Sequence, residues 1–295
     1  MLIALLQTMR PKQWLKNTVI FAALVFDHQL WPLNADPAPT LRTLVGFVLL
    51  CVLSSTVYLI NDLADIEKDR QHPKKRFRPL ASGALKPGVA QAAAGLMGLS
   101  ALGVAFWLNP QFGIIGLVYL SANLAYSFGL KHVAIVDVLI VALGYLLRVQ
   151  AGVALIVVER FSPWLYLCVG LGALFLGFGK RRGELLLVQN GSSTRKVLED
   201  YSLPFLDEMI NIVATATIVA YSLYTFSAEN LPKNHAMMLT IPFVLYGIFR
   251  YLYLIHMKGE GGAPDELVLT DRPLQATFAL WAVAAVLVLY LNPPR

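Results

Sequence analysis

Nine apolar stretches, each long enough to cross a lipid bilayer as an α-helix, limit what this chain can fold into. A transmembrane helix needs about 20 predominantly apolar residues. The stretches are apolar on all sides, as lipid-embedded helices are, and they lack the alternation of membrane β-strands. They lie at residues 15–32, 42–64, 89–108, 112–129, 134–157, 162–180, 204–227, 235–256 and 273–291.

The composition supports the same conclusion. Of the 295 residues, 57% are hydrophobic and 14% are charged, whereas about 25% charged residues are usual in soluble domains. One soluble core of this size cannot bury so much apolar surface, so a soluble enzyme is excluded. Cys51 and Cys168 form no CxxC motif, which excludes zinc and redox sites built on cysteine. We therefore expect one all-α, polytopic membrane domain over residues 1–295, with about nine transmembrane helices.

The positive charges indicate the orientation of the chain. A net charge of +6 is compatible with nucleic-acid binding, but the lysines and arginines are concentrated in alternate loops. One side of the predicted membrane protein receives 18 of them and the other side receives 4, while Arg148 and Arg250 lie inside predicted spans. Cytosolic loops of membrane proteins carry the excess of Lys and Arg. The pattern predicts a multi-pass protein of the inner (plasma) membrane, with a cytosolic N-terminus, an external C-terminus and no nucleic-acid partner.

The end of the second stretch carries acidic residues on one side of a predicted helix. At about 100° per residue, Asn61, Asp62, Asp65 and Asp69 share one arc of that helix. Acids are unfavourable at a helix C-terminus, and a bound cation would offset their repulsion. A solvated helix end would mix acids with bases, whereas these acids are segregated. Carboxylate and amide oxygens suit Mg²⁺, so we expect a Mg²⁺ site here with Asp62, Asp65 and Asp69 as catalytic residues.

A basic run follows directly, in the sequence HPKKRFRP. Carboxylate-held Mg²⁺ beside a cluster of cations is the arrangement expected around a diphosphate leaving group. A positive-inside anchor is the alternative role for these side chains. The four cations are Lys74, Lys75, Arg76 and Arg78.

Two charged residues lie inside the fifth stretch. Asp137 and Arg148 are 11 positions apart and so share a helix face, with Arg148 about 16 Å deeper at 1.5 Å per residue. A charge at that depth marks a functional pocket by default, and a structural ion pair with another helix is the alternative. Tyr126 and Lys131 lie at the turn just before and are further candidates.

Polar residues also flank the first and sixth stretches. Lys12, Lys16 and Asn17 belong to the segment RPKQWLKN, for which an interfacial anchor and a ligand-binding role are both open. The loop expected after the sixth stretch begins with GKRRGE. It contributes three candidate substrate-binding residues, Lys180, Arg181 and Glu184, and Tyr201 follows later in the loop.

The pattern NDxxDxxxD after the second span resembles the UbiA superfamily of intramembrane prenyltransferases. Further segments are similar to one branch of it, the decaprenyl-phosphate phosphoribosyltransferases. The resemblance implies a UbiA-like helical bundle with its active site at the cytosolic helix ends. It also adds Tyr58 to the predicted substrate-binding residues. The similar segments are RPKQWLKN, YLIND, HPKKRFRP, YSFGLK, the pair Leu147-Arg148, GKRRGE and PDELVLTDRP.

The resemblance implies Mg²⁺-dependent transfer of 5-phosphoribose from phosphoribosyl pyrophosphate (PRPP) to a polyprenyl phosphate such as decaprenyl phosphate, in lipid-linked arabinan synthesis. The superfamily usually has a second Asp-rich motif after the sixth helix, and the basic run from Lys180 to Arg182 replaces it here. An aromatic prenyltransferase would use the same Mg²⁺ face and is the alternative. A transporter would place its polar groups at mid-membrane, unlike this chain. The prenyl chain length and the oligomeric state, including a homo-oligomer, stay open.

Overall fold

The computed structural model describes residues 1–72, 75–158, 162–189, 196–229, 231–259, 267 and 270–291, and the regular structure in these ranges is entirely helical. Eight of the helices are long and apolar enough to cross a membrane. This confirms the all-α, multi-pass prediction. The eight are α3 (Ala38–Ala64), α5 (Pro87–Leu108), α6 (Pro110–Phe128), α7 (Val136–Leu155), α8 (Pro163–Gln189), α9 (Leu203–Ser227), α10 (Ile241–Met257, preceded by η5, Ala236–Thr240) and α12 (Arg272–Leu291).

The first predicted stretch differs from the other eight. A short helix, α1 (Leu2–Met9), is followed by a 3-10 segment, η1 (Pro11–Ile20), and by α2 (Phe21–Phe26). The β-branched run Thr18-Val19-Ile20 has low helix propensity and lies where the 3-10 geometry ends. His28, at φ 58°, is in the left-handed region just after α2. Residues 15–32 therefore form short helical pieces and not one long α-helix.

Prolines open most of the long helices. A proline lacks the N–H that would be unsatisfied in the first helical turn anyway, and its fixed φ suits that position. In α9 the start also has a cap, because the Ser202 hydroxyl accepts a hydrogen bond from the Phe205 N–H at 3.3 Å. The prolines in question are Pro39, Pro87, Pro110, Pro163, Pro204, Pro242 and Pro273.

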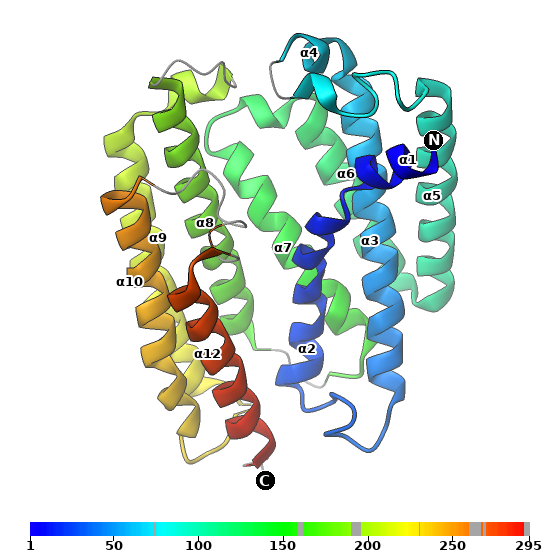
Figure 1. The fold of residues 1–295 in the computed structure, drawn as a ribbon. Helices are drawn as coiled ribbons and strands as arrows, with labels where there is room; N and C mark the ends of the chain where they lie inside the picture. Colours follow the sequence, from blue (N-terminus) through cyan, green and yellow to red (C-terminus); the bar gives the residue numbers. More distant parts are fainter. Residues whose placement is uncertain are drawn as a thin grey trace. The chain divides into compact units, whose positions relative to one another are not determined.

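The contacts divide the chain into two compact units, of which the first comprises residues 1–24, 29–128 and 147–157. Its central element is α3, which packs against α1, η1, α5 and α6 (Figure 1). Leu50, Leu53 and Phe112 are buried in its core. A Cβ at Gly152 would lie 2.1 Å from the carbonyl oxygen of Ile20, so only glycine permits this close approach of α7 to η1.

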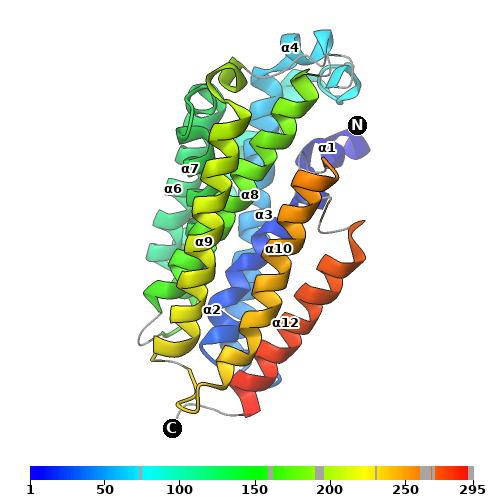
Figure 2. The ribbon, with the colours of Figure 1, turned by 90° about the vertical axis from the view of Figure 1, so that its left-hand side faces the viewer.

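The second unit comprises residues 25–28, 129–146 and 158–295. In it α8 packs along α9, and α10 packs along α12 (Figure 2). Its core includes the buried side chains of Phe178, Leu206 and Tyr251. A Cβ at Gly179 would lie 2.3 Å from the Tyr251 hydroxyl oxygen, so this glycine makes room for that side chain.

The predicted end of the sixth stretch, at residue 180, is too early. The helix α8 continues to Gln189, so Lys180, Arg181 and Glu184 lie on a helix and not in a loop. The segment contains no proline, and Arg181 pairs with Glu184 one turn later. Such i,i+3 pairs stabilise helices, which explains why the glycines around them do not end α8.

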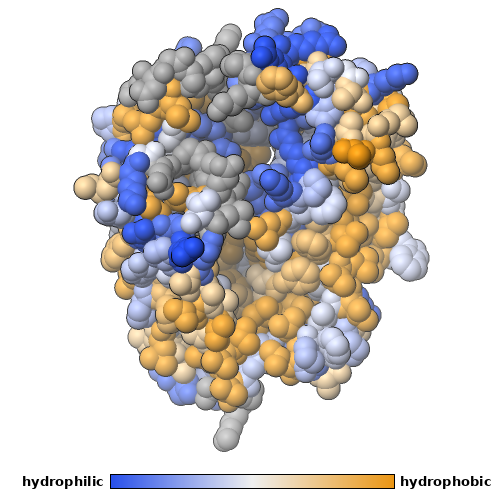
Figure 3. All heavy atoms as spheres, viewed as in Figure 1, coloured by the Kyte–Doolittle hydropathy of each residue, from blue (hydrophilic) through white to orange (hydrophobic). Residues whose placement is uncertain are grey.

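The surface of the first unit suits a lipid environment. Large hydrophobic side chains of α5 point outward, and Trp107 is 85% exposed. On the face drawn in Figure 3, hydrophilic residues gather over α4 (Ile66–Gln71) and the chain that follows it, and hydrophobic residues cover most of the surface below. The polar end of this unit therefore coincides with the segment predicted to bind metal and phosphate.

Candidate active site

The acidic segment is bent rather than a single helix, which corrects the prediction of one continuous arc. α3 ends at Ala64, and α4 begins at Ile66. Asp65 between them has φ −101° and ψ 9°, although its N–H still donates to the carbonyl of Asn61 at 3.0 Å. Asp62 and Asp69 thus lie on successive helices, and the bend at Asp65 sets the position of one carboxylate relative to the other.

One arginine joins the first and last aspartates of the motif. Nη1 of Arg78 donates to Oδ1 of Asp62 at 3.2 Å and to Oδ2 of Asp69 at 2.7 Å. Both aspartates are nearly inaccessible, at 2% and 3% exposure. Because one nitrogen reaches both carboxylates, these two acids lie close together in the structure, although they are on two helices and not on one.

A second arginine contacts the same aspartate. Nη2 of Arg10 lies 2.6 Å from Oδ1 of Asp62, and its guanidinium covers the ring of Tyr58, 4.6 Å from the ring centre. Arg10 belongs to the segment RPKQWLKN, for which the sequence leaves an anchor and a ligand-binding role open, and it is not among the predicted site residues. The sequence feature that could have identified Arg10 as a site residue is its place in RPKQWLKN, the segment that contains the candidates Lys12 and Lys16.

The donor chemistry of this cluster fits a divalent metal ion. Asp62, Asp69 and the nearby Asn61 and Asp65 offer only hard oxygen ligands, which Mg²⁺ prefers. Among the described residues, no three His, Cys, Asp or Glu side chains form a group that could hold a metal ion by themselves. Mg²⁺ usually keeps waters or takes substrate phosphate oxygens beside one or two carboxylates, and the Asp62–Asp69 pair matches that requirement.

The rest of the basic run is more exposed. Lys75 and Arg76 are exposed, and Arg76 covers the ring of Phe77 at 4.9 Å. Lys74 lies outside the described residues. Arg78, in the same run, is half-buried and contacts both carboxylates of the acidic pair, so it lies closer to the predicted metal site than the exposed Arg76.

Arg148 lies in a buried polar cluster of the first unit. Its Nε donates to Oδ1 of Asn17 at 2.8 Å, and its Nη2 donates to the hydroxyl of Tyr119 at 2.9 Å. Nδ2 of Asn17 in turn donates to Ser54 Oγ and Cys51 Sγ, each at 3.3 Å. Asn17 is fully buried and therefore orients Arg148, whereas Lys12 is exposed and Lys16 half-buried. Tyr119 is not among the residues predicted from the sequence, and its only signal there is a hydroxyl inside a predicted span.

Asp137 belongs to a buried cluster of the second unit. Its Oδ2 accepts from Arg181 Nε at 2.5 Å, and its Oδ1 accepts from the hydroxyl of Tyr201 at 2.7 Å. Arg181 also pairs with Glu184. The structure thus gives Asp137 and Arg148 different partners, although both lie on α7. The cluster around Asp137 therefore consists of four predicted site residues: Asp137, Arg181, Glu184 and Tyr201.

The Tyr201 hydroxyl also holds a strained turn. It accepts a hydrogen bond from the N–H of Ile135 at 2.6 Å, and Ile135 has φ 69°, which is rare for a β-branched residue. Burial, together with the hydrogen bond to Asp137, raises the pKa of Tyr201. The hydroxyl therefore stays protonated and donates to Asp137 at neutral pH.

The basic run on α8 is largely engaged with acids of its own unit. Arg182 Nε contacts Asp207 Oδ1 at 2.5 Å, and its Nη1 donates to the carbonyl of Ile255 at 2.8 Å. These contacts tie α8 to α9 and α10 and give Asp207 a structural partner. Lys180 is half-buried. The two remaining candidates, Tyr126 and Lys131, are also half-buried.

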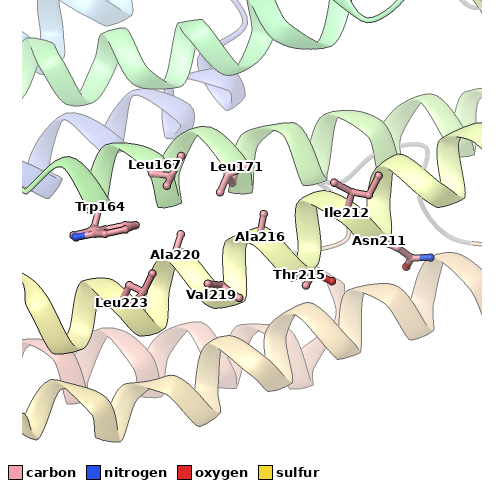
Figure 4. A pocket seen from close by; sticks show the side chains of 10 residues that line it. All are labelled: Trp164, Leu167, Leu171, Asn211, Ile212, Thr215, Ala216, Val219, Ala220 and Leu223. Atoms are coloured by element: carbon pink, nitrogen blue, oxygen red, sulfur yellow. The ribbon is translucent and has the colours of Figure 1, made fainter.

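A separate groove runs along α8 and α9 (Figure 4). Its lining is almost wholly apolar, and it contains none of the predicted site residues. Leu167 and Leu171 line it from α8, and Ala216 and Ala220 line it from α9. The polar clusters, and not this groove, are the candidates for chemistry.

Comparisons with known proteins identify the family. The model of the UbiA prenyltransferase family matches residues 19–264. The decaprenyl-phosphate phosphoribosyltransferase of Mycolicibacterium smegmatis is 36% identical over 293 residues, covering 94% of this chain and 89% of that protein. The enzyme of the same name from Corynebacterium glutamicum is 35% identical over 302 residues, covering 98% and 87%.

A solved structure confirms the fold. The UbiA homolog from Archaeoglobus fulgidus bound to DMAPP and Mg²⁺ matches with a TM-score of 0.72 at 18% identity, covering 96% of this chain and 98% of that chain. The family match spans most of the sequence, and the relatives exceed 30% identity over nearly all of it. The chain therefore belongs to the UbiA prenyltransferase family and is a multi-pass membrane transferase.

Proposed function

We propose that this protein transfers 5-phosphoribose from PRPP to a polyprenyl phosphate and releases diphosphate. The observation that carries the proposal is its similarity, over 94% and 98% of the chain, to two relatives named decaprenyl-phosphate phosphoribosyltransferase. The acidic pair beside Arg78 supports it, because a diphosphate leaving group needs concentrated positive charge.

The reaction replaces one bond at C1 of the ribose. The bond to the diphosphate oxygen breaks and its electron pair leaves with the diphosphate, while an oxygen of the lipid phosphate forms the new bond. That phosphate is already ionised, so the reaction requires no strong general base. This agrees with a candidate site built from carboxylates, arginines and lysines.

Asp62 and Asp69 would hold Mg²⁺ together with phosphate oxygens of the substrate, and Asn61 and Asp65 of the same segment remain predicted ligands. When bound, Mg²⁺ supplies positive charge that binds the diphosphate and stabilises it as it leaves. Arg78 already lies against both carboxylates, and its guanidinium suits bidentate contact with phosphate oxygens. Lys75 and Arg76 are exposed just before it and would share the charge of the donor.

The other cations have different assignments. We assign Lys12 and Lys16, on η1, to the phosphate of the lipid acceptor, because lysines at a helix start near the membrane surface suit a headgroup. Arg181 and Arg182 are paired with Asp137, Glu184 and Asp207. We therefore assign these two arginines to organising the second unit, whereas Lys131 and Lys180 keep their predicted role in anion binding.

The cellular setting follows from the charge pattern. We infer an inner (plasma) membrane protein whose N-terminus and basic loops face the cytosol, where a water-soluble donor such as PRPP is available. The product, a lipid-linked ribose phosphate, would feed the synthesis of lipid-linked arabinan precursors.

A donor-swap assay on the purified protein tests the proposal. Labelled PRPP with decaprenyl phosphate and Mg²⁺ is compared with a labelled prenyl diphosphate and 4-hydroxybenzoate. We expect label to enter the lipid phase only from PRPP, and to stay in the aqueous phase when Mg²⁺ is chelated. Asp69→Asn serves as the inactive control, provided its melting temperature matches that of the wild type. Prenylation of the aromatic acid, with no transfer from PRPP, would overturn the proposal.

A further inference from the structure

We propose that Arg10 is an additional diphosphate-binding residue, held on Asp62 until a divalent cation displaces it onto the donor. The inference deepens the proposed function and rests on it, since it assigns a further binding residue to the same site. It concerns only residues of the first unit, and each contact involved lies within that unit.

Two guanidinium groups converge on one oxygen atom. Oδ1 of Asp62 receives Nη2 of Arg10 at 2.6 Å and Nη1 of Arg78 at 3.2 Å. The carboxylate is 2% exposed, whereas the side chains of Arg10 and Arg78 are 29% and 27% exposed. Each arginine therefore reaches from the partly exposed surface to a buried acid.

This arrangement makes arginine and metal competitors at Oδ1 of Asp62. A carboxylate oxygen has two lone pairs, and Arg10 and Arg78 both donate to this one. A divalent cation that binds Oδ1 therefore competes with both guanidinium groups, and its charge repels them at contact distance. The displaced guanidinium would then lie beside the cation, where the phosphate oxygens of a bound diphosphate are found.

The surroundings of Arg10 suit such a change of partner. Its guanidinium rests on the ring of Tyr58, which lies one helical turn before Asp62 on α3 and so on the same face. This cation–π contact does not depend on Asp62, and it would keep the arginine at the site after the ion pair opens.

The backbone points to the same conclusion. Arg10 has φ 53° and ψ 63°, a left-handed conformation that costs energy for a residue other than glycine. It lies between α1, whose Ala4 and Thr8 are buried, and Pro11, which opens η1. Strained residues of this kind cluster at ligand sites, where the surrounding structure holds them.

Arg70 offers a matched comparison in the same unit. It pairs with Glu67 in an exposed i,i+3 salt bridge, with side-chain exposures of 50% and 77%. It has the same side chain and lies near the same acidic segment, but its acidic partner is not part of the proposed metal site. Competition with a divalent cation is therefore expected of Arg10 and not of Arg70.

The test measures Mg²⁺ binding without turnover. The melting temperature of purified wild type, Arg10→Gln and Arg70→Gln is followed against Mg²⁺ concentration, with and without inorganic diphosphate. For Arg10→Gln we expect the Mg²⁺ midpoint without diphosphate to fall by about tenfold, since one competing charge-assisted hydrogen bond is gone. The diphosphate midpoint at saturating Mg²⁺ should rise by a similar factor, and Arg70→Gln should leave both midpoints unchanged.

Opposite shifts of the Mg²⁺ and diphosphate midpoints distinguish this role from a purely structural role of Arg10. Loss of a structural contact would lower the melting temperature at every ligand concentration without changing either midpoint. Arg10→Lys, which keeps the positive charge, should return both midpoints most of the way to wild type and serves if the glutamine variant fails to fold. Unchanged midpoints, or weaker Mg²⁺ binding in Arg10→Gln, would overturn the inference. The test uses no ribose donor, so a failed donor-swap assay with opposite midpoint shifts intact would remove the proposed function alone.

Discussion

Arg148 on α7 and Asn17 on η1 are joined by a hydrogen bond of 2.8 Å, from the guanidinium Nε to the amide oxygen, across 131 positions of the sequence. Both side chains are buried. A charge inside a membrane-spanning helix is costly and is retained where it has a function. The pair connects the irregular N-terminal segment to the part of α7 that belongs to the same unit, and the hydroxyl of Tyr119 is a further partner of Arg148.

Breaking this pair should show energetic coupling. Arg148→Gln and Asn17→Ala each remove the hydrogen bond, so the double variant should lose less stability than the two single variants together. We expect a coupling of about 1–2 kcal/mol, within the range seen for residues in one buried network. Unfolding in detergent, measured for all four proteins, gives this value. Strictly additive losses would show that the contact does not contribute.

The hydroxyl of Tyr201 can be removed without changing the shape of its ring. Tyr201→Phe leaves Asp137 without one donor and the N–H of Ile135 without its acceptor. We expect a loss of about 1–3 kcal/mol, the usual cost of buried polar groups that lose a partner. The control is Tyr246→Phe, at an exposed tyrosine of α10, which should change stability by less than about 0.5 kcal/mol. Equal effects of both variants would contradict the role assigned to Tyr201.

The ion pair of Arg250 and Asp271 predicts an acid-sensitive contribution to stability. The hydrogen bond from Arg250 lowers the pKa of Asp271 below its ordinary value of 3.8. A lowered pKa in the folded state means that the contribution is complete above the ordinary value. It is lost as the pH falls from there through the lower folded-state pKa.

Asp271→Asn isolates this effect, because asparagine can still accept the hydrogen bond from the Leu274 N–H at the start of α12. The wild type should melt higher than the variant by a constant amount at neutral pH. That difference should shrink below about pH 4. Melting curves from pH 3 to pH 7 check this, and a difference that grows in acid would contradict the assignment.

Reporter fusions test the topology. Three long helices, α7, α8 and α9, separate Lys131 from Lys233, so fusions at these positions should report opposite sides of the membrane. A fusion before α1 tests the short first segment separately. The charge pattern predicts the same side for the N-terminus and Lys131, which requires η1 and α2 to cross together. If the N-terminus and Lys131 report opposite sides, η1 and α2 do not cross the membrane, and the three long helices between these positions account for the result.

The sequence alone predicted the long helices well. Eight of the nine expected stretches correspond to helices within a few residues, apart from the longer α8. Membrane-spanning helices satisfy their backbone hydrogen bonds within one segment, so length and hydropathy of a local stretch are enough to find them. The two errors have local causes that hydropathy does not measure: the low helix propensity of Thr18-Val19-Ile20 and, in α8, the i,i+3 pair of Arg181 and Glu184.

Partner choice, in contrast, was decided by the tertiary structure. The sequence placed Asp62 and Asp69 among candidate ligands, but the bend at Asp65 and the meeting with Arg78 came from packing. Arg10 reaches Asp62 across 52 positions, and no local period relates the two. The sequence specifies the residue types, and hence the carboxylate and amide oxygens available as ligands. Which cation meets which carboxylate depends on how close-packed helices bring distant segments together.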